Sequence, residues 1–132
     1  GLTLTNLDMS GGAVTLNNGA VTIAKRGGSL TLLAGAVTTL TNRGGEVLDY
    51  STGTITTLTN KGHYRKVGFA AKTITNTTIY AGSQTIDANG VVTWTNPPQF
   101  NECRLPESAD DREPDVAYAN FGVHKKLTVA AI

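Results

Sequence analysis

A three-residue motif, an apolar residue followed by Thr and Asn, recurs from residue 4 to residue 96 of this chain. The complete copies are Leu4-Thr5-Asn6, Leu40-Thr41-Asn42, Leu58-Thr59-Asn60, Ile74-Thr75-Asn76 and Trp94-Thr95-Asn96. A degenerate copy, Ile23-Ala24-Lys25, stands where a sixth belongs, so the apolar residue advances by 19, 17, 18, 16 and 20 positions. A second series, Gly12, Gly28, Gly45, Gly62 and Gly82, keeps nearly the same step. Two series with one period indicate a repeat architecture.

A period of about 18 residues is too short for a helical hairpin repeat and suits one turn of a β-solenoid. The composition agrees, because the chain contains 21 Thr and 15 Gly, residues that favour strands and tight turns. In Ala13-Val14-Thr15-Leu16 and Ser29-Leu30-Thr31-Leu32 the aliphatic residues alternate with Thr or Ser. The sequence therefore predicts an all-β protein, a β-solenoid (β-helix) of roughly seven coils with aliphatic residues inside and Thr outside.

Stacked coils bring equivalent residues into columns. One internal stack is predicted to contain Leu4, Ile23, Leu40, Leu58, Ile74 and Trp94. A second contains Val14, Leu30 and Val47. A corner column is predicted from Asn6, Asn42, Asn60, Asn76 and Asn96, whose amides would bond to the coils above and below. A row of amides that binds a ligand is the alternative for this column.

The repeat stops near residue 105. All four prolines, Pro97, Pro98, Pro106 and Pro114, follow the last motif, and six acidic residues lie between Glu102 and Asp115. Proline cannot donate to a strand ladder, so this stretch is predicted to interrupt the sheets. We therefore expect one domain with solenoid repeats over residues 1–105, an insertion or cap loop over 106–125 and a C-terminal strand over 126–132.

Residues that the repeat does not require are the candidate interface. The segment His63-Tyr64-Arg65-Lys66 replaces small residues by bulky and basic ones, and it is predicted to project from a corner, as a contact patch or a solvated bulge. The complete candidate set is Tyr64, Arg65, Lys66, Asp110, Asp111, Arg112 and Phe121. Arg26, Arg43 and Lys61 occupy equivalent positions and predict a basic edge, which would meet an acidic partner or deter aggregation.

No motif in the chain indicates catalysis. His63 and His124 are isolated, Cys103 has no second cysteine, and the acidic residues cluster in one loop instead of recurring at coil spacing. We therefore predict no catalytic residues, no cofactor and no metal. A net charge of +1 argues against nucleic acid as a partner, and the absence of a long apolar run argues against the membrane.

The segments 37–43, 54–61 and 86–96 resemble the Thr-rich solenoid segments of bacteriophage virion proteins, and the resemblance covers about residues 1–105. It implies a rigid, non-enzymatic virion module, a capsid decoration or cement protein that forms a homotrimer and binds another virion protein such as the major capsid protein. Its location would be the virion, or the host cytoplasm during assembly. The resemblance also allows a tail fibre or tailspike segment.

Two other classes of function remain open on the residues alone. Thr-x-Thr triplets, such as Thr57-Leu58-Thr59 and Thr73-Ile74-Thr75, would suit an ice- or surface-binding solenoid, although Lys25 interrupts the outer columns. A carbohydrate-active enzyme or adhesin would need a groove and aromatic platforms. Trp94 is the only tryptophan and is assigned to the core.

Overall fold

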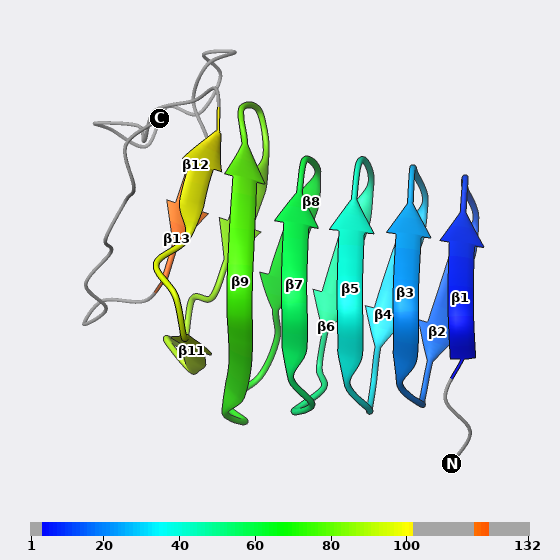
Figure 1. The fold of residues 1–132 in the computed structure, drawn as a ribbon, viewed down its shortest axis with the longest axis horizontal. Coiled ribbons are helices and arrows are strands. Elements are labelled where there is room, and N and C mark those ends of the chain that lie inside the picture. Colours follow the sequence, from blue (N-terminus) through cyan, green and yellow to red (C-terminus); the bar gives the residue numbers. More distant parts are fainter. Residues whose placement is uncertain (1–3, 102–117, 122–132) are drawn as a thin grey trace.

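The protein is a β-solenoid of about six turns with about 17 residues per turn, which confirms the predicted fold class. The computed structural model describes residues 4–101 and 118–121. In that part of the chain every regular element is a β-strand, and the strands of successive turns pair in parallel (Figure 1). The described turns number about six, one fewer than the sequence period predicts.

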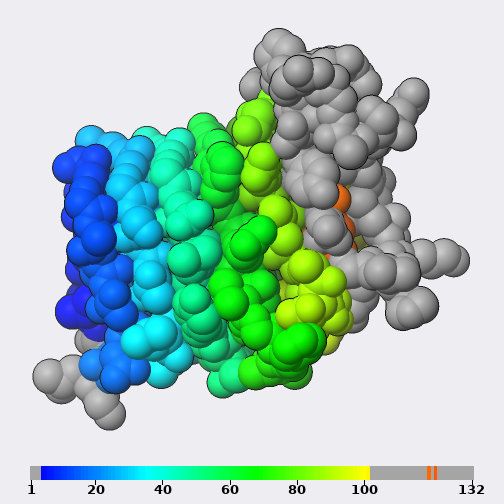
Figure 2. Space-filling view, turned by 180° about the vertical axis from the view of Figure 1, so that it is seen from behind, coloured from blue at the N-terminus to red at the C-terminus, as the bar shows by residue number. Residues whose placement is uncertain are grey.

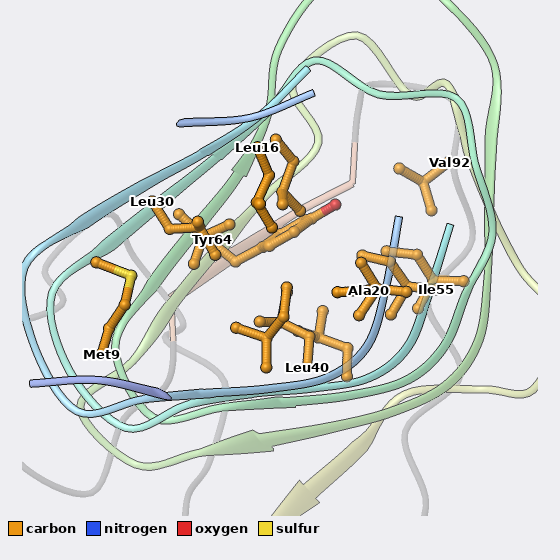
Figure 3. Packing of buried hydrophobic residues seen from close by; sticks show 14 residues of the cluster. Met9, Leu16, Ala20, Leu30, Leu40, Ile55, Tyr64 and Val92 are labelled. Atoms are coloured by element: carbon orange, nitrogen blue, oxygen red, sulfur yellow. The ribbon is translucent and has the colours of Figure 1, made fainter. Parts of the chain in front are cut away.

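Two sheets form the walls of the solenoid. Sheet A contains β1 (Leu4–Met9), β3 (Ala20–Lys25), β5 (Val37–Asn42), β7 (Ile55–Asn60), β9 (Lys72–Tyr80) and β11 (Val92–Trp94), and β12 (Gln99–Asn101) also pairs with β9. Sheet B contains β2 (Ala13–Leu16), β4 (Ser29–Leu32), β6 (Glu46–Asp49), β8 (His63–Lys66), β10 (Gln84–Ile86) and β13 (Tyr118–Asn120). Each turn from β1 to β10 contributes one strand to each sheet, and the last described turn contributes β11 and β12 to sheet A and β13 to sheet B. Side chains from both walls therefore meet in one interior (Figure 3).

The core columns follow from the strand register. Ile23 pairs with Leu40 and Leu40 with Leu58, and all three side chains are fully buried, as predicted. In sheet B, Val14 pairs with Leu30 and Leu30 with Val47, which confirms the second predicted column. Burying an aliphatic side chain stabilises the fold by roughly 1.5–3 kcal/mol, so these columns supply much of the stability.

The predicted internal stack breaks between Leu58 and Ile74. In the structure Ile74 pairs with Ile55, and Thr77 takes the place beside Leu58. Alignment of the motifs would instead have placed Ile74 beside Leu58, which is a register shifted by three residues from the observed one. That alternative would align Ile79 with His63, an exposed position, whereas the observed register buries Ile79 completely. Burial of one more large aliphatic residue favours the observed pairing over the match between motifs.

The two ends of the predicted stack also differ from expectation. Leu4 pairs with Ala20, and Leu4 is 41% exposed because β1 is the end strand of sheet A. Leu7 takes the predicted place beside Ile23. Trp94 pairs with Ile74, but it is only partly buried and lies at the junction with a second apolar cluster.

Only two members of the predicted Asn column share a column inside the solenoid. Asn42 and Asn60 are buried and adjacent, and the Asn42 Nδ2 donates to Asn60 Oδ1 at 3.1 Å. Asn76 and Asn96 form a separate pair on the outer face, with 2.7 Å between Nδ2 of Asn96 and Oδ1 of Asn76. Asn6 is exposed and pairs with Thr22. The register shift at β9 separates the two pairs, since it aligns Asn60 with Ile79.

A small second core lies at the C-terminal end of the solenoid. It contains Ile79, Phe100 and Phe121, and the Phe121 ring meets Trp94 edge to face with 4.7 Å between centroids. The strand β13 pairs with β10, so part of the predicted 106–125 loop is a strand that extends sheet B. The rest of that segment, residues 106–117 and 122–125, lies outside the described residues. The predicted strand 126–132 also lies outside them.

Glycines of the recurring series turn the corner between the two sheets. Gly12, Gly28 and Gly45 all have φ between +72° and +80°, a backbone conformation that disfavours a β-carbon. Gly45 also lies against the turn below, where a β-carbon would overlap the Gly28 carbonyl oxygen, whereas Gly12 has no such neighbour.

Gly45→Ala should therefore destabilise the protein more than Gly12→Ala. The Gly12 change carries only the backbone strain, about 1–2 kcal/mol, and the Gly45 change adds the collision with the Gly28 carbonyl. Guanidinium denaturation of both variants measures the difference in unfolding free energy. Equal losses in the two variants would contradict the close stacking of this corner.

Candidate functional site

A fully buried ion pair connects the two sheets near the middle of the solenoid. Lys72, the first residue of β9, places Nζ 3.0 Å from Oδ2 of Asp49, the last residue of β6, and both side chains have 0% exposure. The ammonium also donates to Ser51 Oγ at 2.8 Å and to the Gly53 carbonyl at 2.6 Å. Three acceptors match the three protons of a charged lysine.

The carboxylate of Asp49 is equally well bound. The Tyr64 hydroxyl donates to Oδ2 at 2.6 Å, and Ser51 donates to Oδ1 from its backbone N at 2.9 Å and its hydroxyl at 2.5 Å. Burial, followed by the Asp49 charge, raises the pKa of Tyr64 well above its usual range. Burial lowers the pKa of Lys72, and the charge of Asp49 opposes that shift. Figure 3 shows the Tyr64 ring reaching into the interior with its hydroxyl at the far end.

Charged residues continue this column in the next turns. Lys66 pairs with Asp49 in register and donates from Nζ to the Val67 carbonyl at 3.0 Å. Asp87 follows β10 in the turn above and accepts from the backbone N of Val91 at 3.0 Å and of Val92 at 2.9 Å. These groups are bound by neighbouring parts of the chain.

A second polar row lies inside the opposite corner. Lys25 donates to Asn42 Oδ1 at 3.3 Å and to the Gly44 carbonyl. Asn42 donates to Asn60, and Asn60 donates in turn to Thr85 Oγ1 at 2.8 Å. Burial lowers the pKa of Lys25, with the charge of Glu46 acting in the opposite direction. Asn42 and Asn60 are enclosed and therefore cannot present their amides to a ligand. The exposed Asn6, Asn76 and Asn96 do not continue their column, so the five amides do not form one ligand-binding row.

The predicted contact patch at His63-Tyr64-Arg65-Lys66 is wrong for two of its residues. The segment is the regular strand β8, and Tyr64 and Lys66 point inward with 1% and 3% exposure. Register decides this, because Tyr64 pairs with Val47 and Lys66 with Asp49, both inward positions. Arg65 is exposed as predicted.

Of the remaining interface candidates, Phe121 is buried in the C-terminal core, which makes it unsuitable as an exposed contact. Asp110, Asp111 and Arg112 lie outside the described residues. The predicted basic edge has the expected alignment. The backbone N of Arg43 donates to the carbonyl of Lys25, the residue before Arg26. The backbone N of Lys61 donates to the carbonyl of Asn42, the residue before Arg43. Arg26 pairs with Asp8 at 3.5 Å, and the Lys61 ammonium lies 4.5 Å from the centre of the Tyr80 ring.

A surface that the sequence did not reveal lies where sheet B turns back toward sheet A. We call it the corner ridge, and it consists of Leu33, Tyr50, Val67 and Phe69. Phe69 is 84% exposed, and Leu33 and Tyr50 are about half exposed. A hollow of about 230 Å³ adjoins the ridge and is lined by Arg65, Ile86 and Ala88 among others. Figure 2 shows sheet B from outside, with successive turns as adjacent bands.

The outer face of sheet A carries Thr in regular columns. Thr39 pairs with Thr57, and Thr41 with Thr59 and then Thr78. Asn6, Ala24 and Asn76 occupy the equivalent outward positions of other turns, so the regular array is confined to the central turns.

Within residues 4–101 and 118–121, no three His, Cys, Asp or Glu side chains form a group able to hold a metal ion. His63 is exposed on the outer face of sheet B beside Glu46, and Cys103 and His124 are outside the described residues. The described part of the chain has no helix long and apolar enough to cross a membrane.

Comparison of the chain with protein-family models, curated proteins and solved structures gave no match. The β-solenoid class therefore rests on the structure itself. Sequence reasoning missed the Asp49–Lys72 pair and the exposed Phe69. A signal for the first was present: Asp49 and Lys66 occupy inward positions of the sheet B alternation, where an unpaired charge would be costly.

Proposed function

We propose that this chain is a rigid, non-catalytic structural module of a bacteriophage virion, a capsid decoration protein that binds the major capsid protein and assembles as a homotrimer. The virion, the trimer and the capsid partner come from the resemblance of residues 1–105 to Thr-rich virion solenoids. The structural observation that favours a stiff module is the internal bonding: ladders of backbone bonds run along both walls, and an ion pair ties the walls together.

The distribution of reactive groups also favours this function. Asp49, Lys72 and Tyr64 are sealed inside and bound to one another. Ice binding is less well supported, because the regular Thr columns span few turns and a flat array needs many repeats to order water. A carbohydrate-active enzyme would need a pair of carboxylates facing a groove. Among the described residues Asp49 and Asp87 face inward, and Glu46 is the one carboxylate in the lining of its hollow.

The test is binding of the purified protein to separated heads and tails of the phage that encodes it. We expect the protein to cosediment with capsids and to saturate at a fixed ratio to the major capsid protein. Binding to tails alone would replace decoration by the tail fibre alternative. Binding to neither would refute the proposal.

A further inference from the structure

The exposed Phe69 belongs to an enlargement of the solenoid turn between β8 and β9. Tyr50 is stacked on Val67, and Ile55 is stacked on Ile74. The chain advances seven residues from Val67 to Ile74, but only five from Tyr50 to Ile55 in the turn below. Gly68, with φ of +86°, turns the chain outward just before Phe69. The two additional residues therefore present a large apolar side chain that the core does not use.

The other members of the corner ridge extend this apolar surface along the solenoid. Leu33, Tyr50 and Val67 occupy equivalent positions in successive turns, because each backbone N bonds to the sheet B strand of the turn before it. In the turn before Leu33 this corner position carries the polar Asn17, and in the turn after Val67 it carries the small Ala88. Leu33 and Tyr50 are exposed and Val67 is partly buried, and exposed apolar residues gathered along one corner are typical of an interaction surface.

The hollow beside the ridge fits an aromatic side chain. Its volume of about 230 Å³ exceeds that of a phenyl group, and its lining combines Ile86 and Ala88 with the guanidinium-bearing Arg65. Arginine stacks favourably on aromatic rings. A second hollow, of about 150 Å³, continues across Arg65 and Ile86 to Glu46 and His63.

The charges on this face complement each other between copies. Glu46 and Arg65 are both exposed on the outer face of sheet B, and neither forms an ion pair with another described residue. One face thus carries an acid and a base that have no ion-pair partner among the described residues, a protruding Phe69 and a hollow. A second copy of the same chain would supply a partner for each of these features.

We propose that the corner ridge and the adjoining outer face of sheet B form the contact between copies of this chain. Phe69 of one copy packs in the hollow beside Arg65 of the next, and Glu46 faces Arg65 across the contact. This inference rests on the self-association included in the proposed function and names the surface responsible for it.

Sedimentation velocity over a range of protein concentrations tests the contact. Wild type should self-associate, and Phe69→Asp should raise the dissociation constant at least tenfold. Val21→Asp is the matched control, because Val21 is a 43% exposed apolar residue on the outer face of sheet A and should leave association unchanged. Circular dichroism and thermal melting confirm that each variant is folded.

A charge exchange identifies the partner as a second copy. Glu46→Arg and Arg65→Glu should each weaken association, and the double variant should restore it, since every contact again pairs unlike charges. A monomeric wild type, equal association of wild type and Phe69→Asp, or no recovery in the double variant would overturn the inference.

Capsid binding by Phe69→Asp, measured separately, distinguishes the two proposals. A self-associating wild type that Phe69→Asp dissociates, but that binds no particle, would leave the contact intact and refute the virion function. A monomeric wild type whose capsid binding is lost in Phe69→Asp would assign the ridge to the capsid and overturn the self-contact.

Discussion

Lys72→Met should lower the unfolding free energy by about 3–5 kcal/mol, because it leaves the Asp49 carboxylate buried without its cation. The remaining donors, Tyr64 and Ser51, cannot replace a full positive charge. Guanidinium denaturation at neutral pH measures the loss. A loss of this size is a large part of the total unfolding free energy, since single domains are typically stable by only about 5–15 kcal/mol.

Two further variants separate the charge from the packing. Combining Asp49→Leu with Lys72→Met removes both charges of the ion pair, and it continues the column in which Leu16 pairs with Leu32. The Lys66 ammonium next to position 49 keeps its bond to the Val67 carbonyl. We expect the double variant to recover part of the loss, with the Tyr64 hydroxyl left unsatisfied, and addition of Tyr64→Phe to recover more.

Arg26→Met is the control for surface charge, because the Arg26–Asp8 pair is more than half exposed and should contribute less than about 1 kcal/mol. If Lys72→Met were as mild as Arg26→Met, the buried pair would not be a major contributor to stability.

Leu58→Asp should prevent folding, since Leu58 is fully buried between Leu40 and Thr77, and the neutral Thr77 hydroxyl beside it cannot compensate the charge of a carboxylate. An unpaired buried carboxylate costs several kcal/mol, and the lost aliphatic contacts add to that cost. The neighbouring change Thr57→Asp should be mild, because Thr57 lies outward and is only partly covered. Circular dichroism and thermal melting of the two proteins provide the comparison, and equal losses would show that the inner and outer faces are wrongly assigned.

The period and the inner and outer faces could be predicted because they depend on local alternation. Ile23, Leu40 and Leu58 repeat with similar neighbours and therefore stack as expected. The register of β9 could not be predicted from the motif, because the Ile74-Thr75-Asn76 triplet is locally equivalent to the others. The competing requirement to bury Ile79 lies outside the triplet, and it decides the pairing.

The candidate site was less predictable for a different reason. Tyr64 and Lys66 resemble surface residues by size and charge, and only the register reveals that they point inward. Likewise, Asp49 and Lys72 are separated by 23 residues, and their pairing becomes visible once the turns are aligned. The exposure of Phe69 depends on the two additional residues in its turn. The repeat period itself varies by several residues, so the sequence does not show which turn is enlarged.

The buried polar side chains make the turns of this solenoid distinguishable from one another. The segments 36–44 and 54–62 are so similar that a strand could pair one turn too early with little loss of apolar contact. Such a slip would place the Lys72 ammonium beside Leu32, which occupies the position below Asp49, and leave a buried charge unpaired. The ion pair thus penalises the misaligned stack more strongly than any aliphatic column can, and it makes near-identical turns non-interchangeable.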